Sequence, residues 1–419
     1  MTGSLRVARP ASPPSSPPRL LRDTAPLPRV PELDGLRALL AWWVVLYHAR
    51  GATFTAARTF EGGPLWFLAD GTLAVDVFMI LSGFVIFFLL DRAHEPYRVF
   101  VVRRFLRLYP AYAVCFAAML LLQGAYVANL ELLRPYHAPD AFAAMLRDAI
   151  DPVVHWRAQV FVHALLLHGP IPEAWLHNAA GAFLNPAWSL SLEWQFYLVV
   201  PLAYALIRRR GAAGVAACLA VTALCWATRN LWPPISFRAF LPIHLHLFAL
   251  GAASYYLFKW VALGDGARRA WIRFAPALAI AGALAIAASN RVRFGPDAEL
   301  VGRWLPMELW AFVLGGVLAA QSPTAGPLAR ATRSLLRWRP LRVLGEISYG
   351  TYVVHWPLMV VCTAALRRLV PDMTPQLHAA LLLATATPLV FAASWALHRF
   401  VELPGIALGH RIARRWMRG

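Results

Sequence analysis

The sequence predicts an all-α fold, namely a polytopic membrane bundle of about ten transmembrane helices with both termini in the cytoplasm. Of the 419 residues, 59% are hydrophobic and only 15% are charged, and the mean hydropathy is +0.53. Soluble globular proteins are about half apolar and about a quarter charged. Ten apolar runs are long enough to cross a bilayer, which takes about 20 residues. Arginine clusters separate these runs, as expected of topology signals on the cytoplasmic side.

The two ends of the chain differ in composition from the part between them. The first thirty residues are rich in Pro, Ser and Arg and lack the apolar core of a signal peptide. We therefore expect a disordered cytoplasmic tail over 1–31, the membrane domain over 32–404, and a basic cytoplasmic tail over 405–419. No shift in composition marks a second domain.

The arginine clusters fix the number of crossings. They all lie on one side only if the doubtful run at 153–168 does not cross, so we expect that run to be re-entrant or interfacial. The expected spans are 36–53, 72–91, 108–127, 187–207, 213–231, 239–259, 272–289, 304–321, 346–367 and 378–400.

Two kinds of partner are not expected from this composition. The formal net charge is +19, but the basic residues lie between apolar runs instead of alternating with aromatic residues, so nucleic acid is not an expected partner. No metal site is predicted either, because the histidines and the four cysteines show no ligand spacing.

Arg37 and His48 are the first ionisable residues inside an apolar run. They are eleven residues apart, about three helical turns, so they share one face at a separation of about 16 Å. Ionisable groups in a membrane span are costly and usually face a polar interior, which makes both residues functional candidates. The alternatives are that Arg37 extends its guanidinium to the membrane surface and that His48 is a hydrogen-bonded structural residue.

Asp76 lies in the second expected span, near the same outer half of the membrane as His48. A carboxylate at that level would hold the imidazole in one tautomer, which is the support that a histidine base needs. The alternative is that Asp76 pairs with an arginine for structure alone.

Arg104 and Arg107 form an R-x-x-R pair at the cytoplasmic boundary of the third expected span. Residues three apart share a helix face, and two guanidinium groups on one face suit phosphate oxygens. The alternative is that both arginines only anchor the helix on the cytoplasmic side.

Two later runs bring further polar residues into the bundle. In "NPAWSLSLEWQFYLVVPL", an aromatic belt at the membrane surface would explain the Trp and Tyr residues but not the glutamate, which indicates a wet cavity. In "LGEISYGTYVVHWPLMV", a histidine precedes a proline that kinks the helix, so this histidine serves either the kink or the cavity. The candidates from both runs are Trp188, Ser189, Glu193, Tyr197, Tyr349 and His355.

Five motifs together resemble acyltransferase family 3, a family of integral membrane acyltransferases that includes bacterial O-antigen and exopolysaccharide O-acetylases. In chain order they are "LDGLRALLAWWVVLYHA", "VDVFMILSGFVIF", "RRFLRLYPAY", "PAWSLSLEWQFY" and "ISYGTYVVHWPL". The resemblance covers nearly the whole chain. It implies a ten-helix domain in the bacterial cytoplasmic (inner) membrane that moves an acyl group, usually acetyl from acetyl-CoA, to a hydroxyl of a carbohydrate or glycolipid acceptor. Acyl-CoA would be a co-substrate, with no permanently bound cofactor.

The resemblance also implies roles for single residues. The essential histidine and the arginine of the family's first helix match His48 and Arg37, and the acidic residue of its second helix matches Asp76. The R-x-x-R pair, Arg104 and Arg107, is assigned to the acyl-CoA side.

The combined hypothesis makes His48 the general base, oriented by Asp76 or acting through another polar group, with Arg37 lining a tunnel between donor and acceptor. The rival hypothesis is a proton-coupled transporter or flippase in which His48 and Asp76 relay protons.

Overall fold

The computed structural model describes most of the chain. The described residues are 30–53, 68, 70–262, 270–292, 298–319, 327–371 and 373–418. The tail expected over 1–31 falls outside them, apart from its last two residues.

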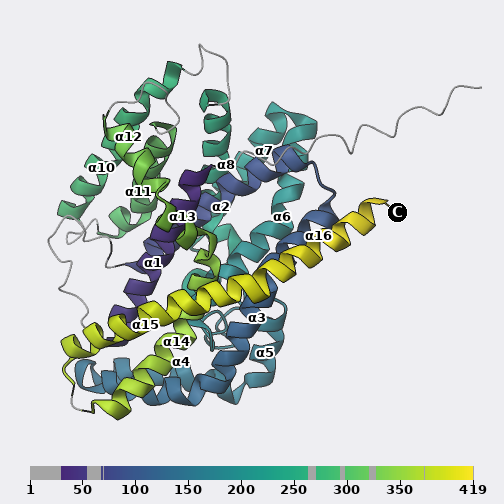
Figure 1. Cartoon of the computed structure of the whole chain (residues 1–419). Coiled ribbons are helices and arrows are strands. Elements are labelled where there is room, and N and C mark those ends of the chain that lie inside the picture. Colours follow the sequence, from purple (N-terminus) through teal and green to yellow (C-terminus); the bar gives the residue numbers. More distant parts are fainter. Residues whose placement is uncertain are drawn as a thin grey trace, which may run out of the picture. The chain divides into compact units, whose positions relative to one another are not determined.

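Among the described residues, ten helices overlap the ten predicted spans (Figure 1). Apart from an isolated antiparallel bridge between Pro172 and Ile235, the regular secondary structure of the described residues is helical. The ten helices are α1 (Pro31–Thr53), α2 (Gly71–Ala93), α3 (Tyr97–Leu130), α6 (Trp188–Arg210), α7 (Ala212–Ala227), α8 (Leu241–Ala262), α10 (Ala275–Val292), α11 (Ala298–Ala319), α14 (Ser348–Leu369) and α15 (Pro375–Leu397). The shorter helices are α4 (Pro139–Val154), α5 (Trp156–Ala164), α12 (Pro327–Leu336), α13 (Arg339–Glu346) and α16 (Leu403–Arg418).

Seven helical segments among the described residues are long and apolar enough to cross a membrane. They comprise α2, α3, α6, α8, α10, α14 and the continuous segment of α15 and α16, whereas α7 and the 304–319 part of α11 are shorter apolar helices. The chain is therefore a multi-pass helical membrane protein, as the composition predicts.

Two segments show how helix length relates to the membrane. The third span was expected over 108–127, but α3 begins at Tyr97 and has 34 residues, which corresponds to about 51 Å and exceeds the hydrocarbon core of about 30 Å. The R-x-x-R pair therefore lies inside the helix instead of before it. In the doubtful run at 153–168, α5 has nine residues, or about 13 Å, which is too short to cross.

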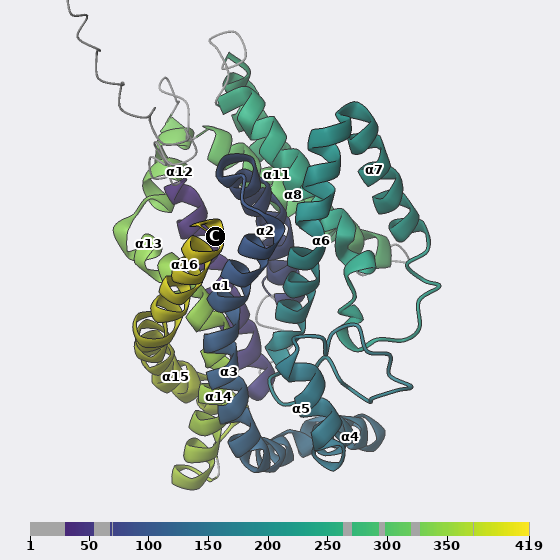
Figure 2. The same cartoon turned by 90° about the vertical axis from the view of Figure 1, so that its right-hand side faces the viewer.

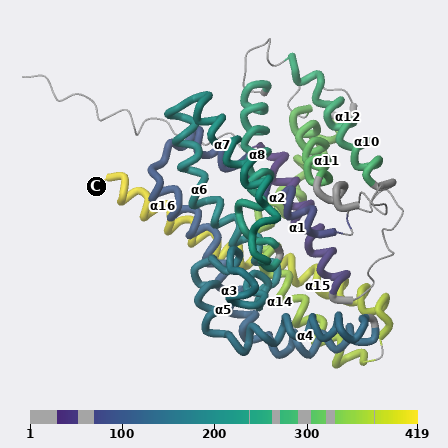
Figure 3. The backbone as a smooth tube through the Cα atoms, turned by 180° about the vertical axis from the view of Figure 1, so that it is seen from behind, coloured from purple at the N-terminus to yellow at the C-terminus, as the bar shows by residue number. Residues whose placement is uncertain are grey.

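The helices that carry the candidate residues pack against one another. Helix α1 contacts α2, α13, α14 and α15, and α14 also contacts α3. Figure 3 shows α6 and α7 on one side of α8, with α10 and α11 on the other. Helices α1, α2, α3, α6 and α14 therefore surround the region where the predicted site residues lie.

Helices α2 and α8 cross with their backbones almost touching. A Cβ built on Gly83 would lie 2.1 Å from the Phe248 carbonyl oxygen, and one on Gly251 would lie 1.9 Å from the Ile80 carbonyl oxygen. Small residues allow such a close approach in membrane bundles. This crossing fixes α2, which carries Asp76, relative to α8.

The C-terminal basic stretch is helical. Helix α15 runs through a π-helical turn, η7 (His398–Glu402), into α16, and Figure 1 shows α15 and α16 in yellow as one long helix. Within the turn, His398 Nδ1 lies 2.8 Å from a carboxylate oxygen of Glu402. Helix α16 packs on α3, where Arg98 donates a hydrogen bond of 3.0 Å to the Trp416 carbonyl.

At the other end of α3, helices α4 and α5 lie across the end of the bundle (Figures 1 and 2). The segment after α5 carries His168, which stacks on His163 with ring centroids 4.1 Å apart. Both rings are fully buried and lie outside the candidate spans. Burial lowers the pKa of His168 to about 4, although its hydrogen bond to the Ala187 carbonyl opposes the shift.

The close crossing of α2 and α8 can be tested by adding one methyl group. We expect Gly83→Ala and Gly251→Ala each to destabilise the detergent-solubilised protein by about 1–3 kcal/mol, because the added Cβ overlaps a carbonyl oxygen of the facing helix. Gly124→Ala in α3 is the matched control, because a Cβ there meets nothing within 4 Å. Thermal unfolding of the three variants measures the effect, and equal melting temperatures would contradict the close crossing.

The neutral state of His168 predicts a loss of stability in acid. In the unfolded chain this histidine titrates near pH 6.5, so between pH 6.5 and 4 the unfolded state binds more protons and stability falls as the pH falls. His168→Phe keeps an aromatic ring but removes the titration. We expect about 2 kcal/mol less destabilisation between pH 7 and pH 5 in the variant than in the wild type.

At pH 7 the same variant should be less stable than the wild type by about 1–3 kcal/mol, because the Ala187 carbonyl loses its donor. Unfolding curves across this pH range in one detergent would measure both effects. Parallel pH dependence in wild type and variant would show that His168 does not titrate as described.

Candidate active site

One end of the bundle interior carries a cluster of arginines. Helix α1 places Arg37 close enough to Arg107 of α3 for their charges to interact, and Tyr197 of α6 interacts with both Arg104 and Arg107. We call Arg37, Arg104 and Arg107 the arginine cluster. Arg37 also lies 3.3 Å from a carboxylate oxygen of Asp34, one turn earlier in its own helix.

The arginines of α3 differ in whether other protein groups accept the hydrogen bonds of their guanidinium groups. Arg103 forms an ion pair with Glu95, and Arg98 donates to the Trp416 carbonyl. Arg104 lies over the ring of Phe100, with 5.8 Å between its guanidinium carbon and the ring centroid. Its Nε is buried and has no hydrogen-bond partner among the described residues. Arg104 therefore has donor capacity left for a ligand.

Glu193 is the carboxylate beside the arginine cluster. It accepts hydrogen bonds from Tyr197 of its own helix and from Ser82 of α2, the latter at 3.3 Å. Arg37 of α1 and Tyr352 of α14 lie near enough to feel the charge of this carboxylate. Glu193 thus lies between helices in the bundle interior, in a setting that an aromatic belt at the membrane surface does not provide.

A hydrogen-bonded pair connects α14 to the first residues of α6. The hydroxyls of Tyr352 and Ser189 are 2.6 Å apart, and Tyr352 also donates to the Pro186 carbonyl at 2.9 Å. One turn earlier in α14, Tyr349 donates to the Leu108 carbonyl of α3 at 2.6 Å. Both tyrosine hydroxyls are therefore occupied by protein groups.

His48 lies at the other end of this polar path, beside His355. Their ring centroids are 5.2 Å apart, and the Trp356 ring lies 5.0 Å from that of His48. The side chain of His48 is partly exposed, whereas His355 is fully buried. Because α1 is an unbroken helix from Pro31 to Thr53, Arg37 and His48 do lie on one face of it.

Hydrogen bonds and ring contacts link most of these residues into groups of neighbours inside the bundle, and together we call them the polar column. Its members come from α1, α2, α3, α6 and α14. They are Arg37, Arg104, Arg107, Tyr197, Glu193, Ser82, Tyr349, Tyr352, Ser189, His355 and His48.

Asp76 has a different neighbour from the one expected. Its described ion-pair contact is with His244 of α8, whose Nδ1 lies 3.9 Å from Oδ1 of Asp76. The ring of Trp188 lies 6.3 Å from that of His244. An orienting contact from Asp76 to His48 is not among the contacts of the described residues and stays a prediction.

Sequence reasoning considered His244 only as a metal ligand and missed its contact with Asp76. The available signal was its position in the first turn of an apolar span, at the same membrane level as Asp76. Tyr352 was left out of the candidate residues although it lies midway between Tyr349 and His355 at three-residue spacing. That spacing places the three side chains on one face of α14.

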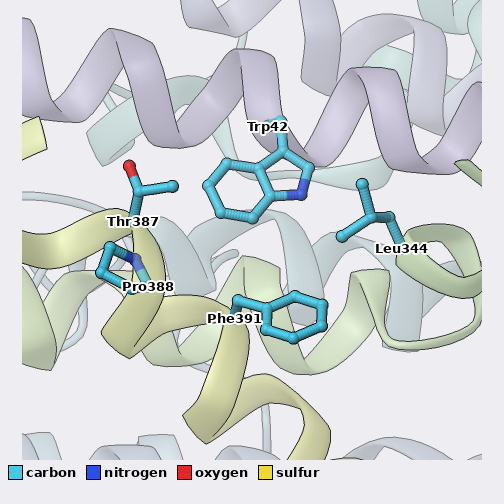
Figure 4. A pocket seen from close by; sticks show the side chains of 5 residues that line it. All are labelled: Trp42, Leu344, Thr387, Pro388 and Phe391. Atoms are coloured by element: carbon cyan, nitrogen blue, oxygen red, sulfur yellow. The ribbon is translucent and has the colours of Figure 1, made fainter. Parts of the chain in front are cut away.

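An apolar groove lies elsewhere on the bundle, between α1, α13 and α15 (Figure 4). Its volume is about 450 Å³, and its lining residues are Trp42, Leu344, Thr387, Pro388 and Phe391. The lining exposes no polar surface. The groove suits hydrocarbon and does not suit a phosphate or a sugar, so it does not belong to the polar column.

A comparison with known protein families identifies the family of the chain. The family model Acyl_transf_3, described as an acyltransferase domain, matches residues 30–399. The chain belongs to acyltransferase family 3. The match includes every member of the polar column and confirms the resemblance drawn from the five motifs.

Curated relatives are similar at moderate identity. The acyltransferase MdmB of Streptomyces mycarofaciens is 31% identical over 43% of this chain and 41% of its own length. The putative peptidoglycan O-acetyltransferase YrhL of Bacillus subtilis is 27% identical over 80% of this chain and 49% of its own length. The peptidoglycan O-acetyltransferase OatA of Listeria monocytogenes is 25% identical over 90% of this chain and 55% of its own length. The chain thus spans about half the length of these relatives, and no solved structure matches it.

The contact between Asp76 and His244 can be tested with a double-mutant cycle. We expect Asp76→Asn and His244→Gln each to lower thermal stability, and the double variant to lose less than the sum by at least about 0.5 kcal/mol, because either substitution alone already removes the pair.

Additive losses in that cycle would mean that the two residues do not interact. A parallel cycle between Asp76→Asn and His48→Ala tests the pairing expected from the sequence. Non-additivity confined to this second cycle would assign Asp76 to His48.

Proposed function

We propose that this protein is an integral membrane O-acyltransferase that moves an acyl group, acetyl in the first instance, from acyl-CoA to a hydroxyl of a carbohydrate or glycolipid acceptor. The observation that carries the proposal is the arginine cluster, which lies in an apolar bundle of this family and is joined by the polar column to a histidine pair. The proposal places the protein in the bacterial cytoplasmic membrane. Acyl-CoA is a co-substrate and not a resident cofactor.

The arginine cluster is suited to the phosphates of acyl-CoA. Three guanidinium groups near one another repel, and the repulsion is strong where water is scarce, so an anion that binds among them is favoured. Asp34 and Glu193 offset only part of the charge. The buried Nε of Arg104 adds a donor without a partner, which a phosphate oxygen would satisfy.

His48 is the proposed general base. It takes the proton of the acceptor hydroxyl as the oxygen attacks the thioester carbonyl, and it returns that proton to the CoA sulfur when the C–S bond breaks. A positioned base of this kind accelerates a reaction by about 10²–10⁴. The partial exposure of His48 supports this role, because a substrate can reach the ring.

The acceptor is proposed to bind between the first turns of α6 and the facing side of α14. Trp188 and Ser189 begin α6 at the level of the histidine pair, and Glu193 follows one turn later. The hydroxyls of Tyr197 and Tyr349 already donate to protein oxygens. In this proposal those two residues shape the pocket and leave the polar contacts with a sugar to Oε2 of Glu193, since the described hydrogen bonds of Glu193 go to Oε1, and to the lone pairs of Ser189, whose hydroxyl also contacts Tyr352.

The relatives favour a cell-envelope glycan as acceptor. YrhL and OatA are named for O-acetylation of peptidoglycan, and a sugar hydroxyl in a polymer outside the cell suits a site whose histidine end faces away from the cytoplasm. Membership of an acyltransferase family favours this proposal over the proton-coupled transporter, which has no use for phosphate-binding arginines.

Substitutions in α3 separate acyl-CoA binding from general charge effects. We expect Arg104→Gln and Arg107→Gln to weaken acetyl-CoA binding at least 10-fold, because a charge-assisted contact to phosphate contributes about 1.5–3 kcal/mol. The matched control is Arg98→Gln, which removes the same charge from the same helix at a residue bound to the Trp416 carbonyl. The acetyl-CoA-induced shift in melting temperature measures binding in detergent.

A second measurement, the turnover of acetyl-CoA by the same variants, tests the transfer reaction itself. Labelled acetyl-CoA and a cell-envelope glycan extract should give CoA release and a labelled glycan with the wild type and Arg98→Gln, but not with His48→Ala. If acetyl-CoA neither stabilises the wild type nor turns over, the acyltransferase proposal fails and transport becomes the working hypothesis.

A further inference from the structure

His355 is a buried histidine with one ring nitrogen unused. The side chain is fully buried within α14. Its Nδ1 lies 3.1 Å from the carbonyl oxygen of Thr351, one turn earlier. A carbonyl oxygen can only accept, so Nδ1 carries the proton and Nε2 of the neutral ring presents a lone pair. Nε2 is buried and has no hydrogen-bond partner among the described residues.

Two described rings contact that of His355, and they differ in whether they can donate to this lone pair. The Tyr352 hydroxyl, whose ring lies 6.1 Å from that of His355, already donates to the Pro186 carbonyl. The His48 ring lies 5.2 Å from the His355 ring, with 31° between their planes. Two imidazoles joined edge to edge by an N–H···N hydrogen bond have centroids about 5 Å apart, because the bond spans about 2.9 Å and each nitrogen lies about 1.1 Å from its centroid.

His48 is the complementary group for this position. A neutral imidazole carries one N–H and one lone pair, so His48 can donate to His355 while its second nitrogen faces the acceptor. The carboxylate expected to orient His48, that of Asp76, has its described contact with His244 instead.

We propose that His355 is the positioning residue of His48: when the His48 ring turns its N–H toward Nε2 of His355, which has no hydrogen-bond partner in the described part of the chain, the bond that forms leaves the other nitrogen of His48 to deprotonate the acceptor hydroxyl. This proposal rests on the proposed function. His355 keeps its own proton throughout the transfer, and the acceptor proton passes through His48 alone. The hydrogen bond to Thr351 fixes the tautomer of His355, which in turn fixes that of His48.

The experiment compares two substitutions at His355. His355→Gln retains an oxygen that can accept near the position of Nε2, whereas His355→Leu fills a similar volume and accepts nothing. The probe is acetyl-CoA turnover, measured as CoA release at a saturating amount of cell-envelope glycan extract, which yields an apparent kcat and a KM for acetyl-CoA. The acetyl-CoA-induced shift in melting temperature shows whether each variant is folded and binds the donor.

We expect His355→Leu to lower the apparent kcat by about 10- to 100-fold with an unchanged KM for acetyl-CoA. His355→Gln should recover at least about a third of the wild-type kcat. If His355 only filled space, the two variants would not differ in kcat alone. Recovery of kcat in His355→Gln would therefore show that His355 orients His48.

A second readout does not depend on turnover. In protein labelled with ¹⁵N-histidine, the ring resonances of His48, assigned by their loss in His48→Ala, report which of its nitrogens carries the proton. We expect one tautomer in the wild type and in His355→Gln, and a mixture in His355→Leu.

The outcomes distinguish this proposal from the proposed function. Three outcomes would overturn the positioning role: equal kcat losses in both His355 variants, an unchanged kcat in His355→Leu, or a His48 tautomer that is the same in all variants. In each case an active wild type would still uphold the acyltransferase proposal. A wild type that turns over no acetyl-CoA would overturn the acyltransferase proposal, and the ¹⁵N spectra would still show whether His355 holds His48.

Discussion

The carboxylate of Glu193 is the group on which the polar interior depends. It accepts hydrogen bonds from Ser82 of α2 and from Tyr197 of α6. An unpaired carboxylate inside an apolar bundle is costly, so these two helices gain stability by directing a donor to the same point. The positions of Ser82 and Tyr197 follow from that requirement, and Arg37 of α1 lies near enough to feel the same charge.

The polar column separates two kinds of chemistry by distance along the helices. Cationic groups that suit phosphates gather near the first turns of α1 and within α3, and imidazoles that suit proton transfer lie about three turns farther along α1. The hydroxyls of Tyr349 and Tyr352 between them are bound to backbone carbonyls. Their fixed side chains give the column a rigid middle section, so the separation between phosphate binding and proton transfer is a property of the fold.

The helices and the residues that share a helix face were predictable, because both depend on residues close together in the sequence. Hydrophobic run length gave the ten helices, and helical spacing put Arg37 with His48 and Arg104 with Arg107. The contacts between distant segments were not predictable in the same way. Asp76 and His48 belong to the same membrane level by residue counting, yet the contact of Asp76 is with His244, because the glycine crossing holds α2 close to α8. The difference between Arg103 and Arg104 was also hidden, since only packing decides which of two adjacent arginines meets Glu95.

The continuous helix from α15 to α16 is longer than the hydrocarbon core of a bilayer is thick. The segment from Pro375 to Arg418 has 44 residues, a length of about 66 Å, more than twice the hydrocarbon thickness of about 30 Å. A long hydrophobic helix adapts to a thinner or thicker bilayer by tilting or by kinking, and Pro388 and the π-helical turn are the places where this helix can bend. Helix α14 packs along α15, so a change of tilt moves the helix that carries His355 relative to the one that carries His48. Lipid composition would then change the geometry of proton transfer through the helix formed by α15 and α16, whose C-terminal part packs on α3, the helix that carries Arg104 and Arg107.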